Sequence, residues 1–139
     1  MKNVKPVLIC SNVLQRMIEH AACEYPLECC GLLSGVQGVI DVIRPTGNDR
    51  QSSTEFSVPH RELFDFFKEI RRTRWQHLGI YHSHPNGDAF PSDRDVTEFH
   101  YPRVSYWIVS LKVQKPNVRC YLWEEGSFHE AVYEVLDTT

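Results

Sequence analysis

Two histidines and an aspartate stand at a spacing that could bind a metal ion. His82 and His84 end an apolar run with one residue between them, and Asp95 follows eleven positions after the second histidine. Alternate side chains of a β-strand point to the same face, so the two imidazoles can converge on one ion. Asp95 can reach that ion from the first turn of a following helix. Two imidazoles and one carboxylate leave a fourth tetrahedral position open to water, as in catalytic zinc sites.

The same stretch also has a purely structural interpretation. A His-x-His pair alone is a weak sign of a metal. Ser92 and Asp95 have the spacing of a helix capping box, in which a hydroxyl and an acid accept hydrogen bonds from backbone amides. Asp95 would then only begin a helix. We favour the metal site because a histidine pair on a strand, a proline that ends the strand and an acid at a helix start coincide in one short stretch.

A hydrolytic metal site also needs a group that takes a proton from water and passes it to the leaving amine. Glu28 is the candidate for this role. It stands at the entrance of an apolar stretch, residues 29–35, where partial burial could raise the pKa of its carboxyl into a useful range. An exposed position at a strand edge is the alternative that the spacing leaves open.

The pattern of apolar residues predicts the elements that hold these side chains. Helical periodicity predicts a helix from residue 12 that Pro26 ends, a second helix that opens at Pro59, and a short third helix over residues 92–100. The polar residues 45–54 should form an exposed loop. The last three predicted strands suggest an antiparallel meander. Short apolar or alternating runs predict strands at residues 7–10, 29–35, 40–43, 55–58, 78–84, 104–113, 118–124 and 128–136.

The composition is that of an ordinary globular protein, and 139 residues fit one domain over residues 1–139. The net charge is −3 and clustered basic residues occur only at 71–74, so nucleic acid is not an expected partner. No apolar run is long enough for a signal-peptide core or a membrane span, and a cytoplasmic protein is expected. The five cysteines form no C-x-x-C pair, which favours reduced, mostly buried thiols.

Taken together, these residues resemble the JAMM (MPN-plus) metalloprotease family. The family pattern is a glutamate, then His-x-His, then ten residues and an aspartate. Glu28, His82, His84 and Asp95 stand at those positions, and Ser92 lies three residues before the aspartate, as the family expects. The chain is similar to short, single-domain prokaryotic members of the family, and the resemblance covers nearly its whole length.

The resemblance implies a fold and a set of residue roles. The fold would be α/β (mixed α+β), with a curved mixed β-sheet flanked by helices, similar to the cytidine deaminase arrangement. One Zn²⁺ per chain would be held by His82, His84 and Asp95. Glu28 would act as general base and then as general acid, and Ser92 would stabilise the oxyanion of the tetrahedral intermediate. Ser92 and Asp95 would then be withdrawn from helix capping to serve the metal.

The resemblance also implies a substrate. Family enzymes cleave the bond after the C-terminal glycine of a ubiquitin-like or sulfur-carrier protein, so a zinc-dependent peptidase or isopeptidase acting on a carrier with a C-terminal Gly-Gly is expected. Residues 55–58 could offer an exposed strand edge along which such a tail pairs. Cys30 is expected to pack behind Glu28 rather than to act as a nucleophile, because no basic neighbour is evident.

Two other functions use the same residues. A binding scaffold could keep the fold without turnover. A non-haem iron oxygenase also uses two histidines and one carboxylate, although it would have no use for Glu28 or Ser92. Neither the carrier, nor its leaving group, nor the oligomeric state follows from the sequence.

Overall fold

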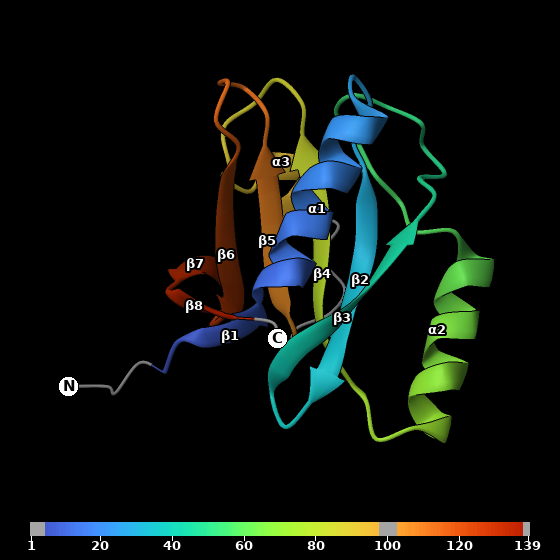
Figure 1. Cartoon of the computed structure of the whole chain (residues 1–139). Coiled ribbons are helices and arrows are strands. Elements are labelled where there is room, and N and C mark those ends of the chain that lie inside the picture. Colours follow the sequence, from blue (N-terminus) through green and yellow to red (C-terminus); the bar gives the residue numbers. More distant parts are fainter. Residues whose placement is uncertain (1–4, 98–102, 138–139) are drawn as a thin grey trace.

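The three-dimensional structure is a computed structural model that describes residues 5–97 and 103–137 (Figure 1). Its helices are α1 (Ser11–Glu24), α2 (His60–Arg72) and α3 (Asp93–Thr97). Its strands are β1 (Val7–Cys10), β2 (Cys30–Val36), β3 (Val39–Thr46), β4 (Gln76–His84), β5 (Ser105–Ser110), β6 (Asn117–Glu124), β7 (Ser127–Ala131) and β8 (Tyr133–Leu136).

All of these strands join one mixed sheet in the order β7-β6-β5-β4-β2-β3-β1-β8. The pairs β4–β5, β1–β3 and β1–β8 are parallel, and the other neighbours are antiparallel. The strands β7 and β8 stand at opposite ends of this order, yet only Val132 separates them in the chain. The sheet must therefore curl until its two edges adjoin, and Figure 1 shows β7 beside β8. The expected curved mixed sheet with flanking helices is confirmed.

The helices α1 and α2 cover separate parts of the sheet. Val13, Met17 and Ala21 recur every four residues along α1 and bury one stripe of that helix against Ile9 and its neighbours. On α2 the buried residue is Phe66, which belongs to a second cluster with Leu32, Ile80 and Ile108. Figure 1 shows α1 lying across the front of the sheet and α2 standing beside β3. The two clusters therefore lie on opposite faces of the sheet.

The strand β4 runs between these two clusters. Tyr81 belongs to the α1 cluster and Ile80 to the α2 cluster, as the alternation of a strand requires. A Cβ atom added to Gly31 on the neighbouring β2 would lie 2.3 Å from Cε1 of Tyr81, so this position has no room for a larger residue. His82 and His84 follow Ile80 at two-residue steps, which places both imidazoles on the α2 face.

Several sequence predictions are corrected by the structure. Residues 55–58 form no strand. Glu55 pairs with Arg94, and Phe56 packs on a face of the sheet against His82 instead of joining the sheet edge. Residues 128–136 form two strands separated by Val132, because the chain passes there from one edge of the curled sheet to the other. The antiparallel meander consists only of β5, β6 and β7. The strand β3 extends into the predicted loop as far as Thr46. Residues 98–100 of the predicted third helix lie outside the described residues.

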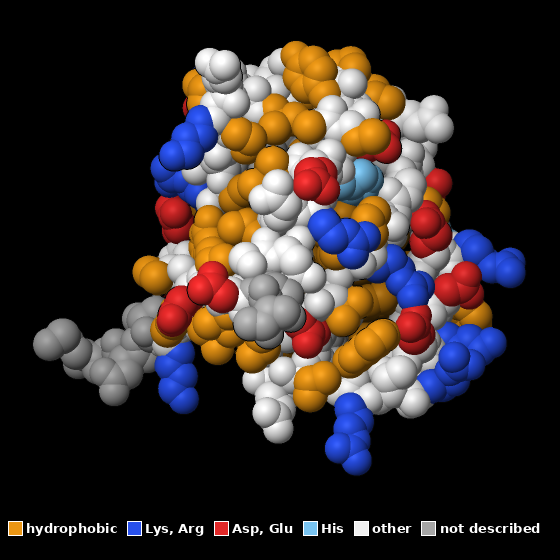
Figure 2. Space-filling model, in the orientation of Figure 1, with side chains coloured by type: hydrophobic (Ala, Val, Ile, Leu, Met, Phe, Trp, Pro, Cys, Tyr) orange, Lys and Arg blue, Asp and Glu red, His pale blue; other side chains and the backbone are white. Residues whose placement is uncertain are grey.

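The surface carries mixed charge. Figure 2 shows Lys and Arg side chains interspersed with Asp and Glu side chains, without a broad basic patch on the visible face. Within the described ranges, no helix combines the length and the apolar character needed to cross a membrane.

His77 gives the packing of α2 a dependence on pH. Its ring contacts Phe66 and Phe67 edge-on at centroid distances of 5.1 and 5.3 Å, and its Nε2–H donates to the carbonyl of Gly79 at 3.0 Å. Burial lowers the pKa of His77 from 6.5 to about 4. Between these two values the unfolded chain binds a proton that the folded protein does not. The free energy of unfolding therefore falls as the pH falls through this window.

We expect His77→Gln to remove this part of the acid sensitivity. Between about pH 7 and about pH 4, the free energy of unfolding of the wild type should fall by up to about 3 kcal/mol more than that of the variant. Urea denaturation with a chelator in every sample measures this difference. His60→Gln, a change at an exposed histidine, should behave like the wild type. Equal pH dependence in the wild type and His77→Gln would contradict the assignment.

Candidate metal centre

The structure brings the three predicted ligands together at the end of β4. The Nε2 atoms of His82 and His84 lie 3.0 Å apart, and each lies 3.2 Å from Oδ2 of Asp95. In tetrahedral zinc sites with Zn–N distances of about 2.0–2.1 Å, neighbouring ligand atoms stand about 3.4 Å apart. The three side chains are also buried. The donor set and its spacing therefore fit one divalent ion such as zinc.

Further contacts orient the two imidazoles. Nδ1 of His84 lies 2.7 Å from the carbonyl of Asp88, and since a carbonyl only accepts, Nδ1 must carry the proton. This tautomer leaves the lone pair of Nε2 for a metal. Phe56 stacks on the ring of His82 at a centroid distance of 4.4 Å and an interplanar angle of 16°. Nδ1 of His82 is buried, and the described residues supply it with no hydrogen-bond partner.

The electrostatics favour a carboxylate at Asp95. Burial alone would raise the pKa of Asp95, but its interactions with the imidazoles of His82 and His84 and the hydrogen bond from the amide of Ser92 hold it well below its usual range. Burial lowers the pKa of His82. For His84, the opposing effect of burial is outweighed by its hydrogen bonds to Asp95 and Asp88, and its pKa is raised. Asp95 is thus ionised and ready to act as a ligand.

Ser92 and Asp95 do form the capping box. The amide of Asp95 donates to Oγ of Ser92 at 3.1 Å, and the amide of Ser92 donates to Oδ2 of Asp95 at 2.8 Å. The expectation that the two residues are withdrawn from capping is therefore wrong, because one carboxylate oxygen faces the amide and both imidazoles together. The Ser92 hydroxyl accepts in this pair, so that bond leaves its own proton available for donation.

Glu28 lies immediately before β2 and is only 5% exposed, which excludes the exposed strand edge as its position. Desolvation raises the pKa of its carboxyl to about 8, although His84 acts in the opposite direction. Asp95 also raises this pKa, so Glu28 is within electrostatic reach of two of the three ligands. Its Oε1 atom is buried, and the residues described provide no hydrogen bond to it. A buried acid that can hold a proton near neutral pH thus adjoins the cluster.

The cysteines do not supply a nucleophile. Burial raises the pKa of both Cys29 and Cys30 to about 12. The Cys30 thiol donates to the carbonyl of Gly47 at 3.2 Å, and Glu28 is among the charges that influence it. Cys30 is therefore a buried thiol within electrostatic reach of Glu28. All five cysteines are free, and only Cys23 is exposed.

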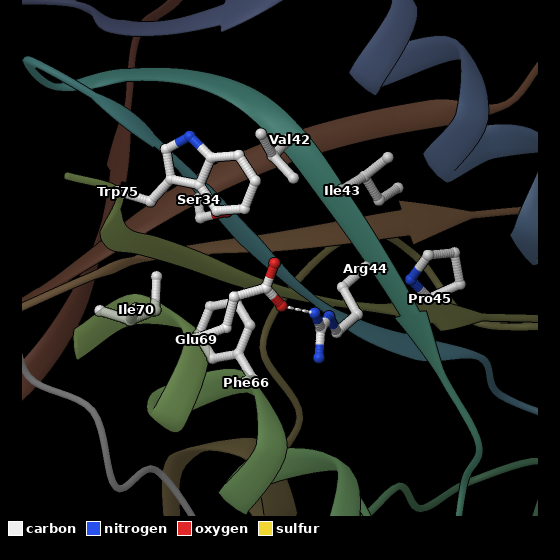
Figure 3. A pocket seen from close by; sticks show the side chains of 9 residues that line it. All are labelled: Ser34, Val42, Ile43, Arg44, Pro45, Phe66, Glu69, Ile70 and Trp75. Atoms are coloured by element: carbon white, nitrogen blue, oxygen red, sulfur yellow. Dashed lines mark hydrogen bonds and ion pairs between the residues drawn. The ribbon is translucent and has the colours of Figure 1, made fainter. Parts of the chain in front are cut away.

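A separate hollow of about 240 Å³ lies between α2 and β3 (Figure 3). Arg44 and Glu69 form an ion pair at its wall. Among the described residues that line the hollow, Glu69 is the only acidic one. The two charged side chains that line the hollow therefore neutralise each other. Its apolar lining comes from Val42, Ile43, Pro45, Phe66, Ile70 and Trp75.

The curled mixed sheet, its flanking helices and the cluster at the end of β4 together define a JAB/MPN-type domain. A JAB1/MPN domain protein from Archaeoglobus fulgidus has the same fold, with a TM-score of 0.62 at 21% identity, covering 95% of this chain and 99% of that one. Residues 11–124 match the model of the prokaryotic homologues of the JAB domain. The chain belongs to this family and is a prokaryotic JAMM-type protein.

Several individual proteins are similar to the chain over most of its length. A probable TtuB-protein conjugate cleaving protease of Thermus thermophilus is 36% identical over 116 residues, covering 83% of this chain and 74% of that protein. The CysO-cysteine peptidase of Mycobacterium tuberculosis is 27% identical over 134 residues, covering 94% and 92%. The solution structure of protein DSY2949 from Desulfitobacterium hafniense matches with a TM-score of 0.85 at 31% identity, covering 94% and 93%.

Sequence reasoning missed two groups that shape the centre. The sequence analysis placed Phe56 in a predicted strand at the sheet edge and did not predict that its ring stacks on His82. The only signal for this role was its position between a polar loop and a helix. Asp88 acts through its backbone carbonyl on His84, and a carbonyl carries no sequence signature. Both groups hold an imidazole in place.

We expect His84→Ala to abolish metal binding and to leave the fold intact, because β4 is held by β2 and β5 on both sides without the ion. Elemental analysis of the purified variant should give much less than one metal ion per chain, and far-ultraviolet circular dichroism should match the wild type. His60→Ala, at an exposed position, is the matched control and should retain the metal. A full complement of metal in the His84→Ala variant would show that the ion binds elsewhere.

Proposed function

We propose that the protein is a zinc-dependent peptidase or isopeptidase that hydrolyses the bond after the C-terminal glycine of a ubiquitin-like or sulfur-carrier protein. The observation that carries the proposal is a buried Glu28, able to hold a proton near neutral pH, beside the cluster of His82, His84 and Asp95. Two relatives support it, since their names describe cleavage of TtuB–protein conjugates and a CysO–cysteine peptidase activity. A third relative, from Haloferax volcanii, is named desampylase and is 28% identical over 102 residues, covering 71% of this chain and 73% of that protein.

His82, His84 and Asp95 would hold one zinc ion. When bound, zinc supplies a Lewis acid that lowers the pKa of a water molecule toward about 7. The chain contributes the orientation of the ligands: the Asp88 carbonyl holds the His84 tautomer, and the Ser92 amide holds the Asp95 carboxylate.

Glu28 supplies the proton transfers. As general base it takes a proton from the attacking water, and as general acid it gives that proton to the leaving amine. Both steps require a carboxyl whose pKa lies near the working pH, and desolvation of Glu28 provides the required shift.

Ser92 supplies a hydrogen bond to the oxyanion. Its hydroxyl proton is not used in the capping box, where its oxygen accepts from Asp95. A donor placed at a developing oxyanion is worth about 3 kcal/mol in the transition state. The Gly-Gly tail of a carrier suits a site whose ligands are buried, because glycines allow close backbone approach.

The direct test is incubation of the zinc-loaded protein with carriers extended beyond Gly-Gly, read by intact mass. The proposal expects a shortened carrier that ends at Gly-Gly. Stoichiometric iron in the native protein, together with turnover that depends on oxygen, would instead support an oxygenase.

We expect Glu28→Gln to abolish this cleavage while zinc binding and the fold remain, because the amide is nearly isosteric but cannot accept the proton. Zinc content and intact mass of the carrier measure the two properties. Glu19→Gln makes the same chemical change on an exposed face of α1 and should leave turnover unchanged. If the wild type and Glu28→Gln are equally inert on every carrier tested, the hypothesis of a binding scaffold survives and that of a peptidase does not.

For Ser92 the informative comparison is between alanine and threonine. Ser92→Ala should lower kcat by about a hundredfold or more through loss of the oxyanion donor, whereas Ser92→Thr keeps a hydroxyl and should recover much of the rate. Loss of the cap should lower the free energy of unfolding of Ser92→Ala by about 1 kcal/mol. A variant that loses only this stability, with kcat intact, would restrict Ser92 to helix capping.

A further inference from the structure

The loop over residues 48–57 contacts three parts of the candidate centre. The carbonyl of Ser52 accepts a hydrogen bond from the amide of Glu28 at 2.8 Å. Phe56 stacks on His82, and Glu55 forms an ion pair with Arg94, the residue before Asp95. The loop therefore touches the acid, one imidazole ligand and the helical turn that carries the carboxylate ligand.

Asn48 holds this loop in shape and ties it to Glu28. Its Nδ2 donates to the carbonyls of Glu28 at 3.1 Å and Glu55 at 3.0 Å. Its Oδ1 accepts from the amides of Arg50 at 3.0 Å and Ser57 at 2.9 Å. Two donors and two acceptor sites are the full capacity of an amide side chain, so Asn48 is saturated. An aspartate side chain has the same length but lacks both donors, and an alanine side chain can make none of the four hydrogen bonds.

Glu28 depends on these bonds because it lies outside the sheet. The ladder of β2 begins at Cys30, and the backbone of Glu28 is instead bound by the loop, at its amide by Ser52 and at its carbonyl by Asn48. On the following residue, the amide of Cys29 donates to Oγ of Ser83 at 2.8 Å. The backbone that carries the buried Glu28 carboxyl is thus held by the loop on one side and by β4 on the other.

We propose that Asn48 is a positioning residue for Glu28. This inference rests on the proposed function, in which Glu28 carries the proton. The four bonds of Asn48 end on backbone groups and none of them ends on His82, His84 or Asp95, so its effect should pass through the acid and leave the metal ligands in place.

The first test compares kinetic constants and zinc content. Asn48→Ala should lower kcat by about 10- to 100-fold, with KM within about threefold of the wild type and one zinc ion still bound per chain. Asn48→Asp should not recover kcat, since it keeps only the acceptors. Thr54→Ala is the matched control, because Thr54 lies exposed in the same loop and its hydroxyl contacts Ser52 Oγ at 3.3 Å rather than the backbone of Glu28. Unchanged kcat, or loss of zinc in proportion to kcat, would overturn the proposal.

The second test does not depend on activity. Amide hydrogen exchange followed by NMR should show the Glu28 amide exchanging several times faster in Asn48→Ala than in the wild type or Thr54→Ala. If the zinc-loaded wild type cleaves no carrier, the proposed function fails, and this exchange rate still decides whether Asn48 holds Glu28. An unchanged exchange rate of the Glu28 amide in Asn48→Ala would overturn the proposal that Asn48 holds Glu28 in place.

Discussion

The candidate centre depends on the pairing of β4 between β2 and β5. His82 stands opposite Cys30 on one side and Ile108 on the other, so its backbone is fixed from both directions. The alternation of a strand then sends His82 and His84 to one face at a fixed spacing. The sheet ladder therefore fixes the spacing of the two imidazoles, and Asp95 completes the ligand triangle from α3.

Around this strand the protein accepts a local cost in stability. A buried polar atom without a hydrogen bond destabilises a fold by about 1–3 kcal/mol. Oε1 of Glu28 and Nδ1 of His82 are two such atoms in the described part of the chain, and both lie at the centre. In contrast, the capping box pairs Ser92 with Asp95, and the Asp88 carbonyl accepts a hydrogen bond from Nδ1 of His84. Unsatisfied groups and a strongly shifted pKa together are typical of a functional site rather than of a packed core.

Much of this arrangement could be predicted from local pattern. The spacing of His82 and His84 on a strand and the position of Asp95 at a helix start depend only on neighbours in the chain, and both were predicted correctly. The burial of Glu28 depends on the loop over residues 48–57, which is distant in sequence, so spacing alone left its exposure open. Residues 55–58 alternate like a strand because Phe56 and Val58 pack against the cluster on the α2 face of the sheet, whereas Glu55 pairs with Arg94. The break at Val132 follows from the curl of the whole sheet, which no local pattern records.

The most direct measurement is a titration of the metal-free protein with zinc, followed by the rate of cleavage of a carrier extended beyond Gly-Gly. If the centre works as proposed, the metal-free protein is inactive, and the rate rises linearly and reaches its plateau at one zinc ion per chain. Cleavage that persists in the metal-free protein, or that appears only with iron and oxygen, would contradict the assignment of His82, His84, Asp95 and Glu28 to a zinc hydrolase.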